Sequence, residues 1–204
     1  MPEEMIGYPD GPEGFPTVYW QAWDVDATFI PGVHLPEESR GRLWAALVIV
    51  YYGDKVVLAD IEGRGLCIPS GKIDPGETVD QAAEREVFEE TGARLDPERR
   101  RLIGCYRMTP RSNPSPPTPL PSREREESSR TRGMRYCPVF VAEALGFEPI
   151  PEGSESRGIF LAAIEDLSDL YFTWDDLMAA VFDLAEQNRQ TLLPSGTPIG
   201  NLEF

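Results

Sequence analysis

The stretch from Gly71 to Ala93 reads GKIDPGETVDQAAEREVFEETGA, and no other part of the 204-residue chain carries as much chemical information. In it, Glu89 and Glu90 follow Glu86 at spacings of three and four. Because an α-helix turns by about 100° per residue, these spacings place the three carboxylates on one face of a helix. Apolar residues fall in or beside the same face, namely Val79, Ala82, Ala83 and Val87. We therefore expect the carboxylates to face the protein interior rather than to form a solvated outer face.

Three carboxylates turned toward a core are costly unless a positive group compensates their charge. A bound divalent cation is the usual compensation, and oxygen ligands suit magnesium or manganese better than zinc. Residues 69–71 (PSG) and 74–76 (DPG) are turn sequences, so a tight loop before the helix can bring backbone oxygens near the carboxylates. The stretch therefore predicts a Mg²⁺ or Mn²⁺ site.

The ends of this helix are also marked in the sequence. Thr78 and Gln81 form the T-x-x-Q pattern of a capping box. Gly92 suits the left-handed conformation that commonly follows the last helical turn. Together these signals predict a helix over residues 79–91.

The whole stretch resembles the Nudix box, G-x5-E-x7-R-E-U-x-E-E-x-G-U, in which U is a bulky aliphatic residue. The matching positions are Gly71, Glu77, Arg85, Glu86, Val87, Glu89, Glu90 and Gly92. Ala93 is smaller than the usual final aliphatic residue, which affects packing after the helix and no chemical group. Because so many positions at fixed spacing form a strict filter, the chain is identified as a member of the Nudix hydrolase family.

The resemblance implies an α/β/α sandwich with a mixed central sheet, and it implies an activity. The expected reaction is metal-dependent hydrolysis of a phosphoanhydride in a nucleoside diphosphate linked to another moiety, or in a nucleoside polyphosphate, with water as the nucleophile. ADP-ribose-like NDP-sugars are one such substrate class. Glu86 and Glu90 are the expected direct ligands of Mg²⁺ or Mn²⁺, together with the backbone carbonyl of Ser70. Glu89 is expected to be a third ligand or to hold a metal-bound water.

Three further residues are candidates for supporting roles. By similarity to the family, Arg85 is expected to orient a box carboxylate through Glu77, although it also suits an ordinary i, i+4 pair with Glu89. Among the acidic residues near the last strand (Glu152, Glu155 and Glu165), Glu155 is our candidate for the general base, against the simpler interpretation of an acidic surface loop. Lys72 is a candidate phosphate contact, and a solvated lysine is the simpler interpretation.

The rest of the chain also contains strand and helix signals. Apolar, β-branched runs predict strands over residues 43–52, 55–61, 102–108, 135–144 and 158–164, with a hairpin turn at 53–54. Thr173 and Asp176 form a second capping pattern, which predicts a last helix with Arg189 in its final turn. Its apolar stripe, Leu177, Val181, Leu184 and Ala185, is expected to cover one sheet face.

The length fits one domain with additions. Residues 1–42 form an N-terminal extension that is too aromatic for a disordered tail, and residues 43–204 form the Nudix domain. The extension packs on its own domain or across a subunit boundary in a homodimer, and the sequence does not choose between the two. Residues 109–133 are a Pro- and Arg-rich insertion that we expect to be flexible. A basic flap over a polyphosphate is the alternative, and no site residue is assigned there.

Composition and charge limit the kinds of partner that the protein is expected to bind. A formal charge of -16 argues against nucleic-acid polymers, which require basic patches, and leaves small phosphorylated nucleotides. No apolar run reaches about 18 residues and no N-terminal signal pattern is present, so we expect no membrane contact and a cytoplasmic location. Cys67, Cys105 and Cys137 lie in strand-like runs and predict no structural disulfide.

Two rival classes of function are open at this point. A Nudix-like module can bind a nucleotide-sugar without turnover, but such modules commonly lose box carboxylates, and this chain keeps them. An acidic helix can also bind metal for stability alone, although the spacing of Arg85 and Glu77 is then unexplained. The nucleoside is not identified. Tyr106, Tyr136 or a tryptophan near the N-terminus are candidates to stack on a base, and aromatic residues in strands are more often core.

Overall fold

The computed structural model describes residues 14–111 and 133–192. Within these ranges a nine-stranded sheet has the order β1-β2-β7-β8-β3-β4-β5, and β6 pairs with β3 while β9 pairs with β4. The strands are β1 (Val18–Trp20), β2 (Val25–Pro31), β3 (Ala45–Tyr52), β4 (Lys55–Ile61), β5 (Gly65–Cys67), β6 (Ser70–Lys72), β7 (Ala93–Pro110), β8 (Arg135–Phe147) and β9 (Ser156–Ala162). β3 and β8 run parallel and the other pairs are antiparallel, so the sheet is mixed, as predicted.

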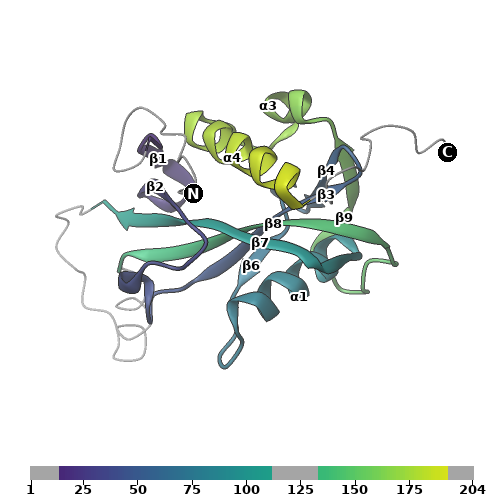
Figure 1. Cartoon of the computed structure of the whole chain (residues 1–204), viewed down its shortest axis with the longest axis horizontal. Helices are drawn as coiled ribbons and strands as arrows, with labels where there is room; N and C mark the ends of the chain where they lie inside the picture. The colour runs from purple at the N-terminus through teal and green to yellow at the C-terminus, as the bar shows by residue number, and fades with distance from the viewer. Residues whose placement is uncertain (1–13, 112–132, 193–204) are drawn as a thin grey trace, which may run out of the picture.

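Two long helices in the described ranges lie on opposite faces of this sheet (Figure 1). They are α1 (Val79–Thr91) and α4 (Asp176–Leu192), and shorter helices are η1 (Gln21–Trp23), η2 (Glu37–Ser39), η3 (Ile164–Asp166) and α3 (Leu167–Leu170). The alternation of side chains along β3 supplies both cores. Ala46, Val48 and Val50 belong to the cluster with Ala82, Ala83 and Val87 of α1, whereas Ala45, Ile49 and Tyr51 belong to the cluster with Leu177, Val181 and Ala185 of α4. The predicted α/β/α layering is therefore present.

The strand predictions were right in place and less accurate in length. β4 has the predicted bounds, whereas the strand predicted over 102–108 is only the second half of β7. The first half of β7 is rich in arginine and acid, and such composition is typical of a loop. It pairs with β8 nevertheless, and ion pairs accompany the pairing: Arg99 Nη1 lies 2.6 Å from Oε2 of Glu143 in β8, and Arg94 Nε lies 2.7 Å from Oε1 of Glu148, the residue after β8.

The predicted start of the last helix was wrong. The side chain of Asp175, not Thr173, accepts the N-terminal bond, with Met178 N donating to Asp175 Oδ1 at 2.9 Å. Trp174 stacks on Phe182 with ring centroids 5.3 Å apart, so this aromatic packing helps to hold the residue before Asp175 outside the helix. Arg189 lies in the last turn, as predicted, with its guanidinium 4.7 Å from the ring centroid of Tyr51.

The residues before β3 add two strands to the edge of the sheet. β2 pairs with β7, from Val25 opposite Pro110 to Pro31 opposite Gly104, and β1 pairs with β2. Phe29 packs against Tyr106 with ring centroids 5.2 Å apart. Residues 14–31 thus lie against the same sheet that carries α1, and the domain boundary at residue 42 stays a prediction.

Most of the predicted insertion at 109–133 lies outside the described residues. Arg111, at its start, donates from Nε to Asp26 Oδ1 at 2.7 Å and lies over the ring of Tyr19. This arginine is therefore attached to the N-terminal strands.

No helix within the described residues has both the length and the apolar character of a membrane span.

Candidate active site

Helix α1 has the ends that its sequence predicts. Gln81 N donates to Thr78 Oγ1 at 3.2 Å and Thr78 N donates to Gln81 Oε1 at 2.9 Å, which completes the capping box. Gly92 has φ 69° and donates its N–H to Phe88 O at 2.8 Å. Because Ala82, Ala83 and Val87 are fully buried against the sheet, the rotation of the helix is set, and so is the direction of its glutamates.

Two of the three predicted carboxylates face inward and one does not. Glu90 is 8% exposed and the side chain of Glu86 is 13% exposed, whereas the side chain of Glu89 is 48% exposed. Glu86 and Glu90 are one helical turn apart on the side that meets β6. Glu89 lies on the other flank of Glu86, so it reaches the rim of the helix and not the interior. The expectation that all three turn inward was therefore wrong for Glu89.

Strand β6 is in direct contact with both inward carboxylates. Ser70 N donates to Glu90 Oε2 at 2.8 Å. A Cβ added to Gly71 would lie 2.0 Å from Glu86 Cδ, so the carboxyl group of Glu86 occupies the space where a side chain would stand. Glycine is the residue that allows this close approach.

Arg85 ties the loop before the helix to the carboxylates. It binds both oxygens of Glu77, with Nε 2.8 Å from Oε1 and Nη2 2.9 Å from Oε2, and Nη2 donates to Lys72 O at 2.9 Å. Its Nη1 donates to Glu86 Oε1 at 2.7 Å and to Glu89 Oε2 at 3.0 Å. The contact through Glu77 and the i, i+4 pair are thus both present. The bonds from Arg85, with the Asp74 N–H, lower the pKa of Glu77 to about 2.

The surroundings of Glu86 and Glu90 disfavour the charged form of both carboxyl groups. The pKa of Glu90 is raised to about 7, chiefly by burial; the charges of Glu86 and Glu155 also raise it, while the Ser70 N–H and Arg64 act in the opposite direction. Burial also raises the pKa of Glu86, against the lowering effect of Arg85. Two buried carboxylates with insufficient positive charge form a donor set that fits a hard divalent cation.

The fit to a metal ion rests on this chemistry. Among the described residues, no group of three or more acidic, histidine or cysteine side chains is gathered as a ready metal site. Glu86 and Glu90 are the side chains that could hold an ion. Backbone oxygens, water or substrate phosphates would have to complete the coordination of such an ion, as is common for magnesium.

Glu155 lies in the loop immediately before β9. Its side chain is exposed, and its backbone carbonyl accepts the N–H of Glu62 at 2.9 Å, which holds the loop beside the end of β4. Its charge raises the pKa of Glu90, so the fold places this distant residue within electrostatic reach of that carboxylate.

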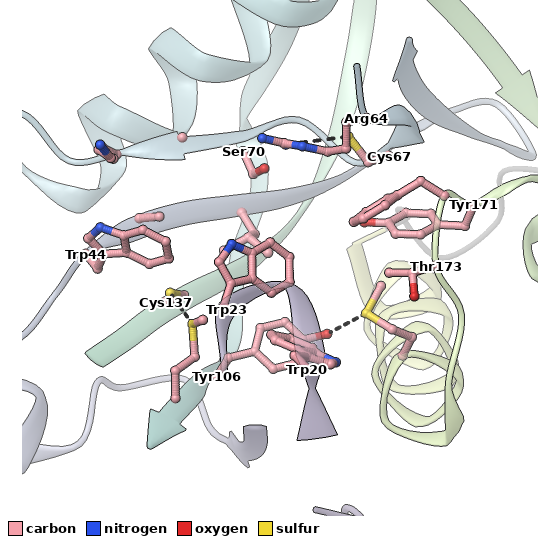
Figure 2. A pocket seen from close by; sticks show the side chains of 17 residues that line it. Trp20, Trp23, Trp44, Arg64, Cys67, Ser70, Tyr106, Cys137, Tyr171 and Thr173 are labelled. Atoms are coloured by element: carbon pink, nitrogen blue, oxygen red, sulfur yellow. Dashed lines mark hydrogen bonds between the residues drawn. The ribbon is translucent and has the colours of Figure 1, made fainter. Parts of the chain in front are cut away.

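On the other side of β6 lies a cavity of about 330 Å³ (Figure 2). Ser70, Gly71 and Lys72 line it, and the first two are the residues that contact Glu90 and Glu86. The cavity and the carboxylates therefore share β6 as a common wall. Aromatic rings supply much of the remaining lining, namely Trp20, Trp23, Trp44, Tyr106, Tyr171 and Phe172.

The sequence predictions missed Arg64. This exposed residue lines the cavity, with Nη1 3.9 Å from Cys67 Sγ, and its charge lowers the pKa of Glu90. No motif position marks it, because it reaches the site through the turn between β4 and β5. Lys72, a predicted candidate, also lies at the cavity and is exposed.

The structure places the two tyrosines that were candidates to stack on a base in different surroundings. Tyr106 lines the cavity but is buried and donates its hydroxyl to Met178 Sδ at 3.4 Å. Tyr136 is 1% exposed and belongs to the core.

The three cysteines are buried with free thiols, and burial raises the pKa of Cys67 to about 11.

Comparisons with known proteins agree with this architecture. A family model described as the NUDIX domain matches residues 41–192. Over 71 residues the chain is 43% identical to the "Putative 8-oxo-dGTP diphosphatase YtkD" of Bacillus subtilis (strain 168), which covers 35% of this chain and 42% of that protein. The match thus spans less than half the length of this relative.

The chain is also similar to solved structures. A mutant of the pyrophosphohydrolase BsRppH from Bacillus subtilis superimposes with a TM-score of 0.57 at 21% identity, over 81% of this chain and 91% of that one. A NUDIX hydrolase from Nitrosomonas europaea gives a TM-score of 0.48 at 20% identity, over 77% of this chain and 97% of that one. The first of these likenesses confirms the predicted fold class.

Proposed function

The chain belongs to the Nudix family, and from this premise we propose that it hydrolyses a phosphoanhydride bond in a small nucleotide. The substrate class is a nucleoside diphosphate linked to another moiety, such as an NDP-sugar, or a nucleoside polyphosphate. Water is the nucleophile, and the reaction requires Mg²⁺ or Mn²⁺.

The observation that carries the proposal is the buried pair Glu86 and Glu90. A purely structural helix gains nothing from two adjacent, inward-facing carboxylates, since burial disfavours the charge of both and the charge of Glu86 further disfavours that of Glu90. A divalent cation held by this pair would compensate both charges and would favour the approach of a polyphosphate to a chain whose formal charge is -16.

Each residue then has a role that follows from its position. Glu86, Glu90 and the backbone carbonyl of Ser70 would hold the ion, which would supply polarisation of phosphoryl oxygens and a more acidic water. Arg85 keeps the carboxylate of Glu86 in place through a bond of 2.7 Å and is itself held by Glu77. Glu89, at the exposed rim, is positioned to meet solvent and incoming substrate.

The proton of the attacking water needs an acceptor. We assign this role to Glu155, whose exposed carboxylate stands in the electrostatic neighbourhood of Glu90 on a loop held by Glu62. Arg64 and Lys72 line the cavity at β6 and supply positive charge there, so they suit contacts with phosphate oxygens.

The test is a substrate panel of ADP-ribose, other NDP-sugars, dinucleoside polyphosphates and nucleoside triphosphates, in Mg²⁺ or Mn²⁺. 8-oxo-dGTP is included because the Bacillus subtilis relative is named as its diphosphatase. We expect turnover of one class, with release of a nucleoside monophosphate or of phosphate products. We also expect at least a 100-fold loss of kcat in Glu90→Gln, a substitution that keeps an acceptor for the Ser70 N–H.

Glu84→Gln is the matched control, because Glu84 is on the same helix with its side chain 69% exposed. This variant should retain wild-type rates. Saturable nucleotide binding with no turnover across the panel would instead identify a binding module and overturn the proposal.

A further inference from the structure

The cavity beside β6 has a wall that the family domain does not supply. The family match begins at residue 41, whereas Trp20 and Trp23 line the cavity from β1 and η1. Figure 2 shows the indole of Trp23 drawn between the indole of Trp44 and the phenol ring of Tyr171, with Trp20 and Tyr106 below them and Ser70 above. The N-terminal segment 18–24 therefore completes this pocket.

Trp20 anchors the segment firmly. Its Nε1 donates to Asp175 Oδ2 at 2.8 Å, and its ring centroid lies 5.1 Å from that of Tyr106. Asp175 is also the residue that caps α4, so one carboxylate joins the segment to the helix above the sheet. The wall is thus formed before any ligand binds, and a preformed wall reduces the entropy lost on binding.

Trp23 differs from Trp20 in its exposure. It is 43% exposed, and its ring lies edge-on to that of Trp20 with centroids 5.5 Å apart. The following residue, Asp24, has φ 52°, and its carboxylate accepts the hydroxyl of Tyr19 at 2.9 Å, so the turn after Trp23 is held in an uncommon conformation. A large aromatic ring kept partly in solvent at the mouth of a pocket is available to a flat ligand.

The chemistry of the pocket selects the ligand class. Aromatic rings dominate one side, while Arg64, Lys72 and the wall shared with the carboxylates lie on the other. A nucleotide matches this division, since its base is flat and apolar on its faces and its phosphates are anionic. At about 330 Å³ the cavity is near the lower end of small-molecule pockets, so it suits one base and not two nucleosides.

We propose that segment 18–24 forms one wall of the nucleobase pocket and that Trp23 stacks on the base of the substrate. This inference rests on the proposed function, because it places the base of the nucleotide whose phosphates meet Glu86 and Glu90. It means that residues outside the family domain recognise the nucleoside. The binding of the base then depends on the N-terminal segment.

The kinetic test compares wild type, Trp23→Ala and Trp23→Phe on the best substrate of the panel. Loss of one stacking ring should raise KM about 10-fold or more and change kcat less than about 2-fold, because the ring is remote from the reacting phosphates. Trp23→Phe should restore most of the affinity, since it retains a flat ring. Phe160→Ala, which removes an aromatic residue of β9 that is 44% exposed and outside the cavity, should leave KM unchanged.

A binding measurement separates this inference from the proposed function. Calorimetric titration in Mg²⁺ with the nucleoside monophosphate of the best substrate, or with AMP and GMP if nothing turns over, should show binding that weakens in Trp23→Ala. Ribose 5-phosphate, which lacks the base, should bind wild type and variant equally. Trp23-dependent binding without turnover would support the pocket while rejecting the hydrolase. Turnover with an unchanged KM in a folded Trp23→Ala variant would overturn the pocket alone.

Discussion

Glu90 is the residue whose environment departs furthest from that of an ordinary surface glutamate. It is almost fully buried, it accepts one backbone N–H, and its neighbours include the carboxylate of Glu86. Its pKa of about 7 means that, without an ion, the protein bears an energetic cost at neutral pH. Function and stability are therefore opposed at this position, as is common in active sites.

This opposition predicts a pH dependence of the metal-free protein. A carboxyl group whose pKa rises from 4.5 to about 7 on folding binds more protons in the folded state. The free energy of unfolding should thus fall as pH rises from about 4.5 to 7, and then level off. The contribution of Glu90 to this fall is at most about 3 to 4 kcal/mol, because the pKa rises by about 2.5 and each pKa unit is worth about 1.4 kcal/mol.

Thermal unfolding in EDTA at pH 5.5 and pH 8 measures the effect. The melting temperature of wild type should drop more between these two conditions than that of Glu90→Gln, which should be the more stable protein at pH 8. Adding Mg²⁺ at pH 8 should raise the melting temperature of wild type and leave Glu90→Gln nearly unchanged. Equal pH dependence of the melting temperature in the two proteins would contradict the prediction that Glu90 causes the loss of stability.

At the scale of the element, α1 shows why a short motif can specify a structure. The capping box, the buried apolar stripe and Gly92 all act within about one turn of the helix, so each signal is local. The same locality explains why the charged first half of β7 was not predicted as a strand. Its conformation depends on pairing with β8, which lies beyond residue 134.

The cap of α1 gives a prediction at this scale. Thr78→Ala removes the acceptor of the Gln81 N–H and should reduce the free energy of unfolding by about 1 kcal/mol. For a chain of this size the melting temperature should fall by about 2 to 4 °C. Thr78→Ser keeps the hydroxyl and should lose little. Because the cap is remote from Glu86 and Glu90, a Thr78→Ala protein that is folded should retain its kcat, and a large loss would show that the cap also positions the site.

At the scale of the whole molecule, the bond between Trp20 and Asp175 joins segments 155 positions apart. It links the N-terminal strands, which supply Trp20 to the lining of the cavity, to the start of α4. Trp20→Phe removes the indole donor, and Asp175→Asn keeps a side-chain oxygen that can cap α4 while weakening the acceptor for Trp20.

A double-mutant cycle tests this link. We expect a coupling free energy of about 1 kcal/mol between the two substitutions, measured by denaturant unfolding of the full chain. Asp175→Asn combined with Tyr19→Phe is the control pair, since Tyr19 bonds Asp24 and not Asp175, and it should show no coupling. A coupling near zero for Trp20 and Asp175 would mean that the segment is held by ring packing alone.

By itself, the sequence determined the family, the layered fold and the position of α1. These follow from spacings within 23 residues and from apolar runs that are contiguous in the chain, and both are readable without knowledge of distant contacts. The same local spacing placed Glu86 and Glu90 correctly and misplaced Glu89, since a helical wheel does not state how wide a face the neighbouring strand covers.

Only the tertiary structure decided which distant residues meet around β6. Glu155, Arg64 and Trp23 come from a loop, a turn and the short helix η1, and nothing in their own sequences relates them to Glu90. Their meeting depends on the order and register of the sheet, in which β9 pairs with β4 and β2 pairs with β7. Such pairings are set by the summed packing of the whole core, because no single residue carries enough free energy to impose them.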